Sequence, residues 1–266
     1  MKSFESQIHP DLEALSQATA AYFASLANHS LKSGQSFYIA ISGGNTPRRL
    51  YQILAQDPYR SENFWFKTHV FWCDERCVPP DHPESNFGAA YRLLLSEVGV
   101  PSNHLHRMRG EWEPSQAVSD YTRQLKEHAA LGFAWPRFDL VLLGLGTDGH
   151  TASLFPGSDP QAGENSPVLA VASSSATVRR DRITLTQQVF NSARQVVFLI
   201  SGADKSQALA NTLSTSVDPV RWPAQRIHPS DGKLLWMIDA AAGRFIEPDP
   251  HQASQVSADK TDFPKS

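Results

Sequence analysis

The segment GLGTDGH at residues 144–150 carries the residue types best suited to catalysis in this 266-residue chain. It directly follows an apolar run at residues 138–143. Its glycines bare the backbone, so that N–H groups of the turn could stabilise an oxyanion. A histidine in such a turn can act as a general base at neutral pH. The segment therefore predicts a catalytic turn that projects Asp148 and His150 from the end of a strand.

The same segment also fits the G-x-G-x-x-G pattern of dinucleotide-binding folds. That function requires a long helix after the glycines and an acidic residue about 20 positions further on. Pro156 and Gly157 would end any helix after one or two turns, and the next apolar run leads into serines at 173–175. We therefore favour the catalytic turn over a nucleotide site.

A second glycine turn, SGGNTP at residues 42–47, follows the apolar run at 37–41. Gly43 and Gly44 allow a sharp turn whose N–H groups can approach a ligand closely. Thr46 suits a helix N-cap and Pro47 the first helical position. A glycine turn that leads into a helix N-terminus is suited to a phosphate, with a tight turn lacking any ligand as the alternative.

Three consecutive charged residues, Asp74, Glu75 and Arg76, follow another buried apolar run. Asp74 or Glu75 could orient a histidine or a sugar hydroxyl, and Arg76 could bind an anionic group. The alternative is a loop held together by salt bridges. These residues predict a polar contribution to a site at the end of that strand.

Further basic residues follow later in the chain. The segment RRDR contains Arg179, Arg180 and Arg182, and Lys205 begins a predicted helix beside Asp204. A lysine in the first turn of a helix is electrostatically unfavourable unless an anion lies nearby. Lys205 therefore points to an anion site, with a solvated lysine as the alternative.

Two residue pairs have spacings found in metal sites. Cys73 and Cys77 lack a second cysteine pair, and His104 and His106 lack an evident third ligand in the sequence. We therefore expect no metal.

These segments need a framework, and one pattern repeats along the chain. Apolar runs end in polar loops that lead into helical segments, which is typical of βαβ units. The runs lie at 37–41, 69–73, 138–143, 168–172, 182–185, 196–200 and 234–238, and the helical segments at 10–29, 47–56, 86–98, 114–131, 187–193 and 203–213. They predict an α/β fold with a mainly parallel sheet, helices on both faces and ligands at the carboxyl ends of the strands.

Composition restricts the possible functions. Lys and Arg number 24 against 27 Asp and Glu, so the net charge of −3 argues against a nucleic-acid partner. No apolar run is long enough to span a membrane, and the N-terminus lacks a secretory leader. Two cysteines suit a reducing cytoplasm. We expect one domain at 1–246 and a mobile tail at 247–266.

Taken in order, these motifs resemble those of the 6-phosphogluconolactonases, a family of the NagB type grouped with the glucosamine-6-phosphate deaminases. The resemblance spans about residues 10–245. It rests on SGGNTP, Asp74-Glu75-Arg76, the run GLGTDGHTASLFP at 144–156, RITLT at 182–186 and Lys205. The run at 144–156 is specific to the lactonases, whereas the glycine turn and the acidic pair are shared with the deaminases.

The resemblance implies a Rossmann-like sandwich that hydrolyses 6-phospho-D-glucono-1,5-lactone in the oxidative pentose phosphate pathway. It implies His150 as catalytic base and Asp74 and Asp148 as its supporting acids. It also implies that the substrate and its phosphate are held by Gly43, Gly44, Asn45, Thr46, Arg76, Arg182 and Lys205. No cofactor and no metal are implied, and the protein is expected to be a monomer or a small homo-oligomer.

Two other functions share parts of this pattern. A glucosamine-6-phosphate deaminase would carry a glutamate-containing segment after the histidine, where this chain has ASLFP at 152–156. A sugar-phosphate sensor without activity would keep the glycine turn but would have no use for His150. Both therefore rank below the lactonase.

Overall fold

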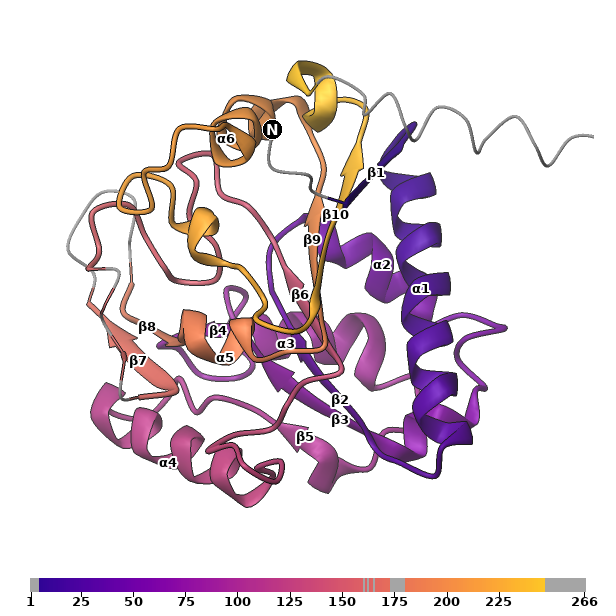
Figure 1. Ribbon diagram of the computed structural model, residues 1–266. Coiled ribbons are helices and arrows are strands. Elements are labelled where there is room, and N and C mark those ends of the chain that lie inside the picture. The colour runs from indigo at the N-terminus through magenta and orange to yellow at the C-terminus, as the bar shows by residue number, and fades with distance from the viewer. Residues whose placement is uncertain (1–4, 160, 162, 165, 173–179, 247–266) are drawn as a thin grey trace, which may run out of the picture.

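The main sheet has seven strands that all run parallel in a computed structural model describing residues 5–159, 161, 163–164, 166–172 and 180–246 (Figure 1). The predicted tail at 247–266 lies outside these residues. Neighbouring strands follow the order β1-β10-β9-β6-β2-β3-β5. Their bounds are β1 Glu5–His9, β2 Phe37–Ile41, β3 Thr68–Trp72, β5 Leu105–His106, β6 Leu140–Leu143, β9 Gln195–Ile200 and β10 Lys233–Asp239.

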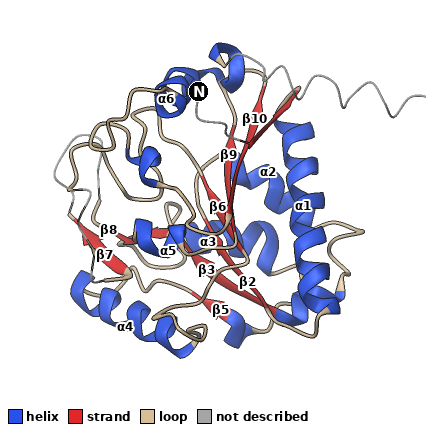
Figure 2. Ribbon diagram, viewed as in Figure 1, coloured by secondary structure: helices blue, strands red, loops and turns tan. Residues whose placement is uncertain are grey.

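Helices cover both faces of this sheet, as the sequence predicts (Figure 2). The strands are apolar on both sides, so successive side chains enter two separate cores: Ile39 and Ile41 pack on one face and Ala40 on the other. One core contains α1 Leu12–Lys32, α2 Thr46–Leu54 and α3 Asn86–Ala90, and the other contains α4 Pro114–Glu127, α5 Gln187–Asn191 and α6 Ser206–Leu213. No helix in the described ranges has both the length and the apolar composition needed to cross a bilayer.

Short helical turns complete the layers. A five-residue π-helical turn at Tyr91–Leu95 extends α3, and 3-10 turns occupy Asn63–Lys67, Ser102–His104, Ala203–Lys205, Pro223–Arg226 and Ala242–Phe245. The turn at Ala203–Lys205 matters most, because it leads directly into α6 and places Lys205 at the end of β9.

Two of the predicted strands do not belong to the parallel sheet. β7 Val168–Val171 and β8 Arg182–Leu185 form a separate antiparallel sheet with β4 Asp74–Arg76, in the order β4-β8-β7. The charged β4 segment lacks strand-forming residues, so its extended form depends on pairing with β8 rather than on local propensity. Cys73 joins the two sheets, because its N–H donates to Ile41 and its carbonyl accepts from Leu185.

The strand order of the parallel sheet has a topological switch point between β2 and β6. From β2 the chain adds β3 and then β5 on one side, and it later returns to place β6 and β9 on the other. Loops that leave such a switch point diverge and leave a crevice at the carboxyl ends of the strands. Ser42, which follows β2, bonds through Oγ to the carbonyl of Leu142 in β6 at 2.8 Å. The glycine turns that follow β2 and β6 therefore begin side by side.

Tyr121 of α4 substitutes for a missing strand beside β3. The ladder between β3 and β5 ends at Phe71 and His106, one residue before Trp72. The Tyr121 hydroxyl accepts from the Trp72 N–H at 2.9 Å and donates to the Trp72 carbonyl at 3.0 Å. Both backbone groups are buried, so an unpaired state would be costly.

Replacing Tyr121 with Phe should therefore destabilise the fold. Loss of the hydroxyl leaves two buried backbone groups of Trp72 unpaired, and we expect the free energy of unfolding to fall by about 2 kcal/mol. Urea denaturation measures the change. Tyr91→Phe, at an exposed position, is the matched control and should alter stability by less than about 0.5 kcal/mol. Equal stability of the two variants would contradict this account.

Candidate active site

The loops at the switch point surround one cavity of about 350 Å³. Nine of the ten site residues indicated by the sequence line it: Gly43, Gly44, Asn45, Thr46, Asp74, Arg76, His150, Arg182 and Lys205. The tenth, Asp148, lies beside His150 rather than on the cavity wall. Groups from β4, β8 and the segments that follow β2, β6 and β9 thus converge on a single space.

Asp148 and His150 form a hydrogen-bonded pair. The Nδ1 atom of the imidazole lies 2.5 Å from Oδ1 of the carboxylate, which also accepts from the His150 backbone N–H at 3.1 Å. The turn that carries them is closed by two backbone bonds, from Gly146 N to the His150 carbonyl at 2.8 Å and from Gly149 N to the Gly146 carbonyl at 3.0 Å. The imidazole is therefore held from both its ring and its backbone.

The electrostatics of this pair determine which ring nitrogen is free. Burial alone raises the pKa of Asp148, but the hydrogen bond and the charge interaction with His150 outweigh it, so the pKa is lowered overall. Asp148 is then a carboxylate and can only accept, which assigns the proton to Nδ1 of His150. In the neutral imidazole, Nε2 is then the nitrogen without a proton and the atom able to take one.

Two glycines give the imidazole its position. A Cβ atom on Gly146 would lie 2.1 Å from the Nδ1 atom of His150 and 2.6 Å from the Asp148 carboxylate. Gly149 has a φ of 87° and packs on Trp222, where a Cβ atom would lie 2.4 Å from the indole. Larger residues would break the turn. These two glycines therefore serve mainly to leave room for neighbouring side chains.

The first glycine turn leads into α2. Gly44 has a φ of 99°, and a Cβ atom on Gly43 would overlap the side chain of Asn86. The N-cap of α2 is Asn45, not Thr46 as expected, because Thr46 already has helical geometry. No side chain caps this helix among the described residues, and its first residues, Asn45 and Thr46, line the cavity.

Two arginines face each other across the antiparallel sheet. The register pairs Arg76 directly with Arg182, and both side chains line the cavity. Like charges at opposed positions destabilise a sheet. Each guanidinium also has a buried Nε atom with no hydrogen-bond partner among the described residues. Burial lowers the pKa of Arg182, although nearby Asp74 raises it. An anion between the two arginines would relieve both costs.

The structure distinguishes the arginines of the RRDR segment. Arg182 lines the cavity, whereas Arg180 is exposed and forms an ion pair with Glu84. Arg179 lies outside the described residues. Lys205 is the third cation on the cavity wall, and its Nζ atom lies 3.5 Å from Asp204.

Asp74 is held by residues that the sequence did not single out. Its Oδ2 atom accepts from the Ser153 hydroxyl at 2.7 Å and its Oδ1 atom from the Asn86 amide at 3.1 Å. Arg182 approaches Oδ2 to 3.6 Å. No hydrogen bond joins Asp74 to His150 in the described part of the chain, so Asp148 alone orients the imidazole. Asp74 instead presents a fixed carboxylate to the cavity.

Ala152 positions this support. Its φ of 47° lies in the left-handed region, which is uncommon for a residue with a side chain. Hydrogen bonds between Thr151 and Leu154 close the turn around it. The strained turn places Ser153 beneath Asp74, and strain of this kind is concentrated at functional sites.

Glu75 does not serve the site in the way the sequence allowed. It is buried and accepts from the backbone N–H groups of Arg76, Asn86 and Phe87 and from the Ser85 hydroxyl. Burial raises its pKa, while these donors lower it. Glu75 therefore ties β4 to the start of α3 and does not line the cavity.

Known proteins with related sequences and structures share this arrangement of elements. The family model described as glucosamine-6-phosphate isomerases/6-phosphogluconolactonase matches residues 10–236. A 6-phosphogluconolactonase from Synechocystis sp. is 41% identical over 216 residues, which is 79% of this chain and 85% of that protein. A solved 6-phosphogluconolactonase from Trypanosoma brucei superposes with a TM-score of 0.78 at 26% identity, covering 92% of this chain and 99% of that chain.

A solved monomeric glucosamine-6-phosphate deaminase has a similar structure, with a TM-score of 0.76. It is 20% identical and covers 91% of this chain and 99% of its own. At this level of identity, the similarity shows only that the two proteins have the same fold.

The role of Gly146 can be tested directly on the imidazole. Gly146→Ala should displace His150 from Asp148, because the added Cβ would overlap the ring. The proton in the Nδ1–H···Asp148 bond should give a far-downfield ¹H NMR signal that this variant loses. Gly144→Ala is the matched control, since a Cβ there meets nothing within 4 Å. Retention of the signal in Gly146→Ala would contradict the geometry.

Proposed function

Because the chain belongs to the family of glucosamine-6-phosphate isomerases and 6-phosphogluconolactonases, we infer that it hydrolyses 6-phospho-D-glucono-1,5-lactone to 6-phosphogluconate, in the oxidative pentose phosphate pathway. The observation that carries this function is the position of His150. An imidazole oriented by Asp148 lines the same cavity as a glycine turn and three cations. His150 provides a base, and the glycine turn with the cations provides an anion-binding region in the same cavity. This arrangement suits a substrate that carries an ester at one end and a phosphate at the other.

The phosphate binds at the glycine turn in this proposal. N–H groups at the start of α2, from Gly44 to Thr46, offer hydrogen bonds and the positive end of the helix dipole. Lys205 supplies a full charge to the same group. The cavity of about 350 Å³ lies within the range of about 300–1,000 Å³ typical of small-molecule sites. The substrate can therefore be anchored by its phosphate while its ring extends toward His150.

Hydrolysis then proceeds by general-base catalysis. Nε2 of His150 takes a proton from water, and the resulting hydroxide attacks the lactone carbonyl carbon. The carbonyl π electrons move onto oxygen and form a tetrahedral oxyanion. As the oxyanion collapses, the bond from carbon to the ring oxygen breaks and Nε2–H returns its proton to that oxygen. Asp148 stabilises the imidazolium between these steps, as the acid of a catalytic triad does.

The cations beside Asp74 are placed to stabilise the oxyanion. Arg76 and Arg182 have buried Nε atoms without partners among the described residues, and preorganised donors of this kind require no rearrangement during the reaction. Asp74, held by Ser153 and Asn86, keeps Arg182 in place and can accept from a sugar hydroxyl. In this scheme Asp74 supports the arginines and the substrate, while Asp148 supports the base.

All of these groups come from one chain, so a monomer would be sufficient for catalysis and a small homo-oligomer is compatible with it. Cys73 and Cys77 are both free thiols, as expected for a protein of the reducing cytoplasm. We propose that the protein is located in the cytoplasm and that its sugar-phosphate substrate is the only partner it requires.

An assay with freshly generated lactone at mildly acidic pH, coupled to oxidation of 6-phosphogluconate, tests this function. His150→Ala should lower kcat by about 10²–10⁴-fold, because it removes the general base. His29→Ala, at an exposed position on α1, is the control and should retain full activity. Near-parental kcat in His150→Ala would contradict the mechanism. Release of ammonia from glucosamine 6-phosphate would favour a deaminase instead.

Lys205→Ala should affect binding more than chemistry. Loss of one charge-assisted hydrogen bond to the phosphate costs about 1.5–3 kcal/mol, so KM should rise about 10- to 100-fold with a smaller change in kcat. Lys126→Ala, at an exposed position on α4, is the matched control. An unchanged KM in Lys205→Ala would contradict the placement of the phosphate.

A further inference from the structure

Four of the ten histidines have rings in contact with one another, and none of the four lines the cavity. His69 lies at the start of β3, and His128 is the C-cap of α4. His104 lies just before β5 and His106 lies in it. Asp74 lies just beyond the other end of β3, five residues and about 16 Å from His69. The cluster is therefore separate from the proposed lactonase site.

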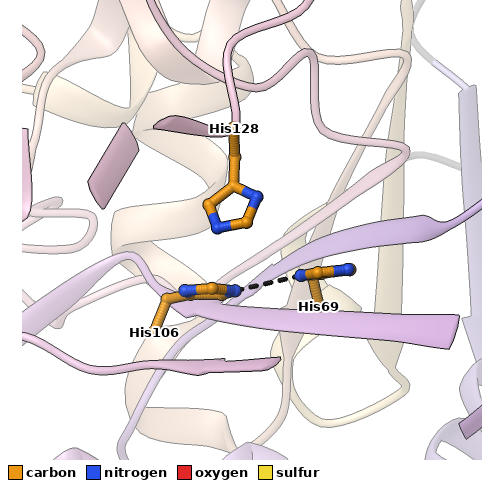
Figure 3. Close-up of side chains that lie close together, drawn as sticks. All are labelled: His69, His106 and His128. Atoms are coloured by element: carbon orange, nitrogen blue, oxygen red, sulfur yellow. Dashed lines mark hydrogen bonds between the residues drawn. The ribbon is translucent and has the colours of Figure 1, made fainter. Parts of the chain in front are cut away.

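Three of these imidazoles bring ring nitrogens together. One ring nitrogen from each of His69, His106 and His128 lies within 4.8 Å of the others. His69 Nδ1 and His106 Nε2 are 3.0 Å apart, and the His128 ring lies over this pair with a nitrogen turned toward it (Figure 3). The spacing of His104 and His106 suits a metal pair, but the sequence predicts no metal, because it shows no evident third ligand. The fold supplies the missing partners from β3 and the end of α4.

We propose that His69, His106 and His128 form a binding site for a divalent transition-metal ion such as Zn²⁺, with solvent completing the coordination. Neutral imidazole is a preferred ligand of these ions. Tetrahedral Zn²⁺ with bonds of 2.0–2.1 Å needs nitrogens about 3.4 Å apart. The pair from His69 and His106 is already close to this spacing. The three nitrogens lie within 4.8 Å of one another, so the His128 ring needs to approach by at most about 1.4 Å. His128 is half-buried at a helix end, where such a shift meets little resistance.

Neighbouring rings hold two of the ligands in place. Tyr38, the neighbour of His69 on β2, stacks on its ring at 4.8 Å. His104, in the turn before β5, stacks on the same ring at 3.8 Å. His106 stacks on Phe71 at 4.2 Å. Stacking fixes the planes of both imidazoles, which lie within 9° of each other. Prior orientation of the ligands lowers the entropic cost of binding an ion.

The surroundings of two ligands are shielded from water. His69 and His106 are only 8% and 6% exposed. His128 caps the carboxyl end of α4, where the helix dipole favours positive charge. A bound ion would connect the edge strand β5 to β3 and α4.

Titration of the tag-free, chelator-treated full chain with Co²⁺, followed by visible absorption, tests the site. We expect one equivalent to bind with ligand-field bands, and Zn²⁺ to displace it. Zn²⁺ at 100 times its Kd should raise the Tm by about 5 °C or more. His128→Gln should weaken Co²⁺ binding by more than about 10-fold. His29→Gln, at an exposed position on α1, which packs in the other core, is the matched control and should bind like the parent chain.

Two further measurements distinguish binding at this site from binding in the proposed catalytic cavity. Saturating 6-phosphogluconate should not displace the ion, and His150→Ala should bind it as tightly as the parent chain. Retained lactone hydrolysis by His128→Gln verifies that this variant is folded. Three results would overturn the proposal: no Co²⁺ binding at millimolar concentration, parental affinity in His128→Gln, or loss of the ion in His150→Ala. The first of these would identify a purely hydrogen-bonded histidine cluster.

Discussion

The hydrogen bond between Asp148 and Nδ1 of His150 is the interaction on which the proposed chemistry depends. It fixes the tautomer and the direction of the imidazole, so that Nε2 is left as the basic atom in the cavity. The bond exists because the turn is closed by backbone bonds of Gly146 and Gly149 and because Gly146 leaves room for the ring. A local sequence of seven residues thus builds a complete acid–base pair. The rest of the fold has to present a substrate to it.

That presentation depends on joining two sheets. The parallel sheet ends its strands at a switch point where glycine turns diverge, and Cys73 leads the chain from β3 into the antiparallel sheet. There Arg76 and Arg182 face each other across the ladder, an arrangement that is unfavourable without a counter-ion. Asp74 offsets part of this charge, and a substrate anion would offset more. The positive charge of the site is therefore maintained by the surrounding fold at some cost in stability.

Much of this could be predicted from the sequence because it is encoded locally. Apolar runs indicated five of the seven parallel strands but missed β1 and the two-residue β5. Glycine turns at 42–47 and 144–150 indicated the cavity that nine of the ten expected residues line. What depends on distant pairing could not be predicted. The strand β4 exists only through β8, and Asn86 and Ser153 act only through Asp74. The histidines that meet His106 come from remote segments. Local residue preferences do not indicate which distant segments will pair.

A crystal structure of the chain with bound 6-phosphogluconate tests the central claim most directly, because it places both ends of the ligand at once. We expect the phosphate against the N–H groups from Gly44 to Thr46 and Nζ of Lys205. The carboxylate formed from the lactone carbonyl should lie about 2.6–3.2 Å from Nε2 of His150, the range in which a general base acts. A carboxylate bound at the glycine turn, or an imidazole turned away from the product, would contradict the assignment.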